Sequence, residues 1–141
     1  MSFREKSAWI SFVSMLAFGA AWLWTIIRHE IYGPRPGNPL HVFLVQLALL
    51  LLLEVGLHVA IAIQSPREAR TPKDERERLI DLKASRVAFY ALLTGAFLTI
   101  WLGLHLHGAT RFFMGQVMMG SIITTLLIRF ATQIALHRRD A

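Results

Sequence analysis

Four long runs of apolar residues alternate with short polar segments along this chain. The runs cover roughly residues 7–27, 40–64, 87–106 and 113–136. Each run reaches the ~20 residues that an α-helix needs to cross the hydrocarbon core of a bilayer. The pattern therefore predicts an all-α fold, an integral membrane four-helix bundle that forms a single transmembrane domain over residues 1–141.

The first run also permits another interpretation, a cleaved signal peptide, because Ala17, Phe18 and Gly19 follow an apolar start. The apolar core of a signal peptide is only ~7–15 residues long. This run continues through Trp22 and Trp24 to Ile27, so we interpret it as a membrane span.

The polar segment at residues 65–86 predicts a short cytoplasmic amphipathic helix that runs on into the third span. Thr71 is a suitable N-cap, Pro72 suits a first helical position, and Asp74 lies where the helix dipole favours an acid. Leu79, Ile80 and Leu82 would form its apolar side.

Composition supports a membrane location and limits the chemistry. The chain is 55% hydrophobic and 17% charged, whereas soluble domains average ~25% charged residues. The absence of cysteine excludes disulfides, thiolate metal sites and a cysteine nucleophile. No Walker loop, HExxH motif or Ser/His/Asp order is present, so we expect neither an enzyme nor a cofactor.

The basic residues predict how the chain is oriented. Eleven of the fifteen Lys and Arg residues lie before the first run, in the segment 65–86 and in the C-terminal tail, and three lie in the other two loops. Cytoplasmic loops are enriched in Lys and Arg. We therefore expect a multi-pass protein of the cell (inner) membrane with both termini cytoplasmic. Membrane orientation accounts for the net charge of +6, so we expect no nucleic-acid partner.

Two segments of the chain resemble one another. Residues 51–61 read LLLEVGLHVAI and residues 126–136 read LLIRFATQIAL, so that Glu54 aligns with Arg129 and His58 with Gln133. One interpretation is coincidence between apolar helices. The other is a duplicated helical hairpin, with two copies of the same topology.

These four polar residues are the first candidate site. An isolated charge at mid-bilayer costs upwards of ~2.5 kcal/mol, so we expect Glu54 and Arg129 to face each other as a buried pair, with His58 one turn from Glu54. The pair would either fix the helix register alone or couple to protons or ions. Gly56 and Ala60 lie on roughly the opposite side of their helix, where another backbone could approach closely.

The histidines form a second candidate site. Four of them fall at the predicted outer ends of the spans, where they would be either solvated or ligands of a metal or haem: His29, His41, His105 and His107.

The charged segment is a third candidate. Charge runs are usually solvated, and the alternative is a docking surface for a cytoplasmic protein. The residues of that surface would be Asp74, Arg76, Arg78, Asp81, Lys83 and Arg86.

The run Asp74–Ile80, which reads DERERLI, followed by Lys83–Arg86 and by Phe89 with Tyr90, resembles a DERERLI-type juxtamembrane motif. That motif belongs to small, uncharacterised four-helix membrane proteins of bacteria and archaea. The resemblance covers about twenty residues of this chain and carries no catalytic residues over. It implies a non-enzymatic membrane protein, of a kind sometimes supposed to work beside helix-turn-helix regulators.

These observations predict a small binding, regulatory or scaffold module in the lipid bilayer, self-associating as a homo-oligomer or bound to a cytoplasmic or membrane protein. One alternative is a small proton- or ion-coupled transporter using Glu54, similar to the compact four-helix multidrug exporters that dimerise around a membrane glutamate. A second alternative is a metal- or haem-binding module using the outer histidines.

Overall fold

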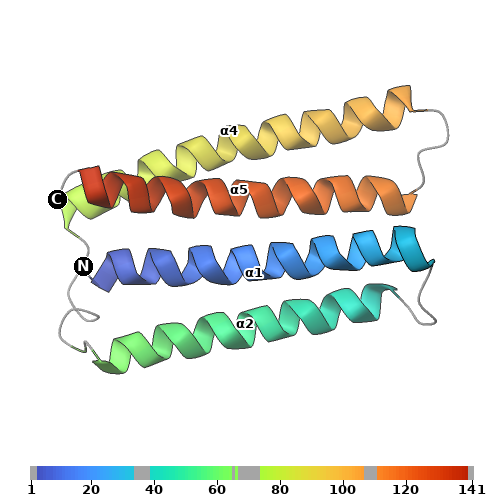
Figure 1. Ribbon diagram of the computed structural model, residues 1–141. Helices are drawn as coiled ribbons and strands as arrows, with labels where there is room; N and C mark the ends of the chain where they lie inside the picture. Colours follow the sequence, from blue (N-terminus) through green and yellow to red (C-terminus); the bar gives the residue numbers. More distant parts are fainter. Residues whose placement is uncertain (1–2, 34–38, 65, 67–73, 107–110, 140–141) are drawn as a thin grey trace. The chain divides into compact units, whose positions relative to one another are not determined.

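The computed structural model describes residues 3–33, 39–64, 66, 74–106 and 111–139, and no strand occurs among them. The predicted all-α, four-helix architecture is confirmed (Figure 1). Each predicted span falls within one helix, apart from Leu106, which is the C-cap of its helix. The helices are α1 (Phe3–Tyr32), α2 (Pro39–Gln64), α4 (Glu75–His105) and α5 (Arg111–Arg139).

All four helices are long and apolar enough to cross a membrane. Such helices satisfy their own backbone hydrogen bonds, which is what a chain in lipid must do. The qualifying segments within the described residues are Glu5–His29, Leu47–Gln64, Glu75–His105 and Phe113–Arg139.

The chain divides into two compact units, Met1–Thr71 and Pro72–Ala141. Each unit is a helical hairpin, the first formed by α1 and α2 and the second by α4 and α5 (Figure 1). This division matches the boundaries expected for two duplicated hairpins, while the duplication itself stays a prediction.

In the first hairpin, α2 is covered along one narrow stripe. Among the α2 side chains that the structure describes, those that are not exposed recur every three or four residues, as one face of an α-helix requires: Leu47, Leu50, Glu54, His58, Ile61 and Ala62. Gly56 and Ala60 lie among the exposed residues. A Cβ built on Gly56 meets nothing within 4 Å, so the close approach of another backbone expected there is not found in the described part of the chain.

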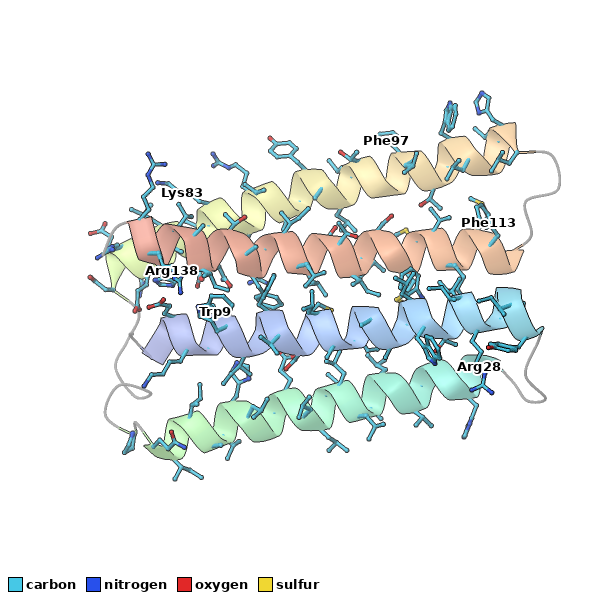
Figure 2. All side chains as sticks on the ribbon, viewed as in Figure 1. Trp9, Arg28, Lys83, Phe97, Phe113 and Arg138 are labelled. Carbon is cyan, nitrogen blue, oxygen red and sulfur yellow. The ribbon has the colours of Figure 1, made fainter. Side chains whose placement is uncertain are left out.

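In the second hairpin, small side chains bring α4 and α5 close together. Ile80, Ala84 and Ala88 are buried at four-residue intervals on α4. Farther along, a Cβ built on Gly95 would lie 2.6 Å from the Cβ of Ser121 on α5. Helices in membranes associate through such close packing, because lipid is as apolar as the side chains themselves. Phe97, by contrast, is exposed and points away from α5 (Figure 2).

The start of α4 differs from the prediction. The N-cap is Asp74, not Thr71, and the helix begins at Glu75. The carboxylate of Asp74 accepts a hydrogen bond from the Glu75 amide at 2.7 Å, and the Glu77 carboxylate accepts one from the Asp74 amide at 3.3 Å. Together these two bonds form a reciprocal capping box, with Glu77 as the acid three residues after the cap. Thr71 and Pro72 lie outside the described residues.

Candidate functional site

Glu54 faces α1 within the first hairpin. The hydroxyl of Ser11 donates a hydrogen bond to Oε1 of Glu54 at 2.8 Å. Ser11 is buried and Glu54 is half-buried. The carboxylate thus has a donor from the neighbouring helix, which offsets part of the cost of placing it in an apolar span.

His58 lies one turn farther along the same face of α2. Its Nδ1 lies 2.8 Å from the backbone carbonyl oxygen of Glu54, and its Nε2 lies 2.9 Å from the hydroxyl of Ser7 on α1. Both ring nitrogens therefore have partners. Together Ser7, Ser11, Glu54 and His58 form a polar cluster in the first hairpin, called here the serine–glutamate–histidine cluster.

The second hairpin has its own polar contact. The side-chain amide of Gln133 on α5 donates a hydrogen bond to Oδ1 of Asp81 on α4 at 2.9 Å. Both side chains are half-buried. A donor from α5 therefore stabilises the Asp81 carboxylate where it packs between helices, as buried or half-buried carboxylates require.

Arg129 and Thr125 lie one turn apart on α5, and both retain unsatisfied polar atoms. Nε of Arg129 and Oγ1 of Thr125 are buried without a hydrogen-bond partner among the described residues. Thr125 is only 8% exposed. Such groups are costly in an apolar span, so this face of α5 is able to take a hydrogen-bond acceptor.

The structure thus brings some of the predicted residues together and separates others. Glu54 and His58 share one cluster, as expected from their spacing. Gln133 bonds to Asp81, a residue predicted instead for the docking surface. Glu54 and Arg129 belong to different units, and their pairing stays a prediction from the sequence.

The serines of the cluster were missed by the sequence analysis. Ser7 and Ser11 are four residues apart, as are Glu54 and His58, and the two helices of a hairpin are antiparallel. Matched four-residue spacing of hydroxyls and ionisable groups on adjacent apolar helices was therefore the available signal. Serine hydroxyls carry no charge, so a search for charged partners of Glu54 and His58 does not find them.

The predicted outer histidines lie on separate helices: His29 on α1, His41 on α2 and His105 on α4. His107 lies outside the described residues. The ring of His105 stacks on Trp101 at 4.8 Å, and its Nδ1 lies 2.9 Å from the Trp101 carbonyl oxygen. Within the described part of the chain, no group of three or more His, Cys, Asp or Glu residues is placed to hold a metal ion.

The predicted docking residues lie at the start of α4. All of them are exposed except Asp81, which is half-buried against Gln133: Asp74, Arg76, Arg78, Lys83 and Arg86. Lys83 marks this end of α4 in Figure 2. Apart from the N-cap Asp74, these residues belong to α4, which runs on into the third span as predicted.

No protein family, curated protein or solved structure matches this chain.

Proposed function

We propose that this protein is a small, non-enzymatic membrane module that binds an acidic cytoplasmic partner protein through the start of α4. The observation that carries the proposal is the length of this helix. At ~1.5 Å per residue, its 31 residues extend for about 46 Å, whereas the hydrocarbon core of a bilayer is ~30 Å thick. Residues 75–86, called here the α4 extension, would project beyond the apolar core.

Basic residues outnumber acids on the exposed face of the α4 extension. Arg76, Arg78, Lys83 and Arg86 are exposed, whereas Glu75 is its one exposed acid. The Asp81 carboxylate turns towards Gln133 of α5, which directs its negative charge away from the exposed face. A positive patch attracts and orients an acidic partner before contact.

The extension is also ordered before binding. The capping box at Asp74 fixes its first turn, and the buried Ile80 and Ala84 hold it in the hairpin. A helix that is already formed loses less conformational entropy when a partner binds. This favours a docking surface over a segment that folds only on binding.

A charge-matched pull-down from native membranes in mild detergent tests the proposal. The Arg78→Gln/Lys83→Gln variant removes two exposed charges from the extension, and the Lys6→Gln/Arg139→Gln variant removes two exposed charges elsewhere. We expect the recovery of a co-purifying acidic protein to fall at least about tenfold with the first variant and to stay unchanged with the second. A tenfold change corresponds to ~1.4 kcal/mol. Equal recovery with both variants would contradict the proposal.

Asp81 is unsuitable for this experiment. Neutralising it would also remove the acceptor of the Gln133 amide, so lost binding could then reflect a disturbed hairpin. Exposed Arg78 and Lys83 avoid that ambiguity.

A small proton- or ion-coupled transporter is the second candidate. The hydrogen bond from Ser11 to Glu54 favours a transporter. It stabilises an ionisable group inside an apolar hairpin through a neutral donor in place of a charged partner. Substrate binding or uptake that depends on pH, and that Glu54→Gln abolishes, would support this candidate. The metal- or haem-binding alternative stays a prediction, for which absorption spectra and metal analysis of the purified protein are the tests.

A further inference from the structure

We propose that the serine–glutamate–histidine cluster of the first hairpin is a proton-binding site, in which Nε2 of His58 takes up the proton and the Ser7 hydroxyl adapts to it. The cluster belongs to membrane-spanning helices and combines an imidazole, a carboxylate and two hydroxyls. The bond that changes is one N–H bond: hydronium gives a proton to the lone pair of the ring nitrogen and becomes water, and the reverse step returns it.

The contacts of His58 determine which of its ring nitrogens carries a hydrogen. Nδ1 lies 2.8 Å from the backbone carbonyl oxygen of Glu54, and a carbonyl oxygen only accepts hydrogen bonds. Nδ1 must therefore carry a hydrogen in both the neutral and the charged ring. In the neutral ring this leaves Nε2 with a lone pair, so Nε2 is the atom that gains a proton.

Ser7 is the partner of the other ring nitrogen. A hydroxyl both donates and accepts hydrogen bonds, so Ser7 donates to Nε2 when the ring is neutral and accepts from it when the ring is charged. The separation of 2.9 Å suits either direction. Only the hydroxyl hydrogen has to rotate, and the site can change its protonation without moving a helix.

The charge of the protonated ring also has to be balanced. A protonated imidazole in an apolar span needs a nearby negative group, and the Glu54 carboxylate lies one turn away on α2, held by Ser11. The charged side chains nearest to Ser7 along α1 are Glu5, which is half-buried, and Lys6, which is exposed. Among the described side chains, Glu54 is the acid that these contacts place beside the ring.

The proton also needs access to the ring. Ser7 lies about 6 Å along the axis from Phe3, the first residue of α1, and His58 about 9 Å from Gln64, the last residue of α2. These two helix ends lie at the same end of the hairpin (Figure 1). A proton therefore has a short path from water at that end, and a path of more than twice that length from the other.

Nitrogen-15 NMR of the full chain in detergent micelles tests the proposal, and His105 is the internal control. His105 makes the same local contact, Nδ1 to a carbonyl oxygen four residues earlier, but it is exposed and stacked on Trp101. In the neutral ring we expect His58 to be the Nδ1–H tautomer with an unprotonated, hydrogen-bonded Nε2. On acidification Nε2 should gain the second proton while Nδ1 keeps its own.

Two variants of Ser7 make the test specific. Ser7→Ala should shift the Nε2 resonance of His58 and leave that of His105 unchanged, and Ser7→Thr, which keeps the hydroxyl, should restore it. An Nε2–H tautomer at alkaline pH would overturn the proposal. So would an Nε2 that gains no hydrogen when the sample is acidified, or an Nε2 resonance that Ser7→Ala leaves unchanged. The wild-type spectra decide the matter even if a variant does not fold.

The site is distinguishable from the transport candidate. A proton that binds His58 without any transported solute would support the site and leave transport unsupported. Glu54-dependent uptake with a His58 ring that never changes its protonation would do the reverse.

Discussion

At the scale of single residues, the spacing between α4 and α5 in the second hairpin depends on which side chains are small. The contact between Gly95 and Ser121 is the clearest case, because a Cβ on Gly95 would lie 2.6 Å from Cβ and 2.7 Å from Oγ of Ser121. The Cβ of Ser121 is fixed to its backbone. It cannot rotate away, so a larger residue at position 95 must push the helices apart.

We therefore expect Gly95→Ala to destabilise the second hairpin by about 1–3 kcal/mol through overpacking. Unfolding of the purified protein in detergent micelles by a chemical denaturant measures this change. Gly115→Ala on α5 is the matched control, because its Cβ meets nothing within 4 Å and alanine is the better helix former. Ser121→Gly added to Gly95→Ala should recover part of the loss. Equal stability of the two single variants would show that the close contact does not exist.

Residue-scale reasoning from the sequence recognised ionisable groups but not all of their neighbours. Glu54 and His58 stood out as polar residues in an apolar run, and they do share one face of α2. Ser7 and Ser11 did not stand out, because serine is common in membrane helices and carries no charge. Apart from their matched four-residue spacing, such uncharged hydrogen-bond partners are identified when the two helices are placed side by side.

At the scale of secondary-structure elements, the hydrophobic runs predicted helices well for a physical reason. A chain in lipid must satisfy every backbone polar group internally, and within a single apolar run of ~20 residues the α-helix does this. The ends of helices are less well determined. Both Thr71 and Asp74 are good caps by residue type, and each is followed three residues later by an acid, Asp74 and Glu77, so the residue pattern does not choose between them.

The cap of α4 can be tested by substitution. Asp74→Ala should remove the bond to the Glu75 amide and cost ~0.5–2 kcal/mol of helix stability, whereas Asp74→Asn should retain most of it. Amide hydrogen exchange measures the effect locally. We expect faster exchange in the first turn of α4 for Asp74→Ala, with the amides beyond residue 90 unchanged. Identical exchange in the two variants would contradict the capping box.

The contact between α4 and α5 predicts a dependence on pH. Gln133→Glu would place a second carboxylate against Asp81, where the wild type has an amide donor at 2.9 Å. Two carboxylates in contact repel each other when both are ionised, so the variant should be less stable than wild type at neutral pH. On acidification one acid takes a proton and can donate to the other.

The difference in unfolding free energy between this variant and wild type should therefore shrink on acidification. Gln64→Glu, at an exposed position of α2, is the control and should show little difference at either pH. A deficit for Gln133→Glu that is constant from neutral to acidic pH would argue against the contact with Asp81.

At the scale of the whole molecule, the chain forms two helical hairpins, and each has a polar contact between its helices near one end. In the first hairpin His58 meets Ser7, and in the second Gln133 meets Asp81. His58 and Gln133 are also the residues that align in the repeated segments. The partner residues on α1 and α4 differ in kind and in position, and the duplication stays a prediction.

The proposed function depends on the membrane orientation, and the chain is well suited to its measurement. It contains no cysteine, so a single introduced cysteine is the only thiol. Ser85→Cys places that thiol on the exposed side of the α4 extension, while Asn38→Cys and Ala109→Cys place it in the other two loops.

Labelling these variants with a membrane-impermeant maleimide, in spheroplasts and in inverted vesicles, tests the central claim directly. Our account predicts that Ser85→Cys is labelled in inverted vesicles alone and that Asn38→Cys and Ala109→Cys are labelled in spheroplasts alone. Labelling of Ser85→Cys from outside the cell would contradict it, because the α4 extension could then meet no cytoplasmic partner.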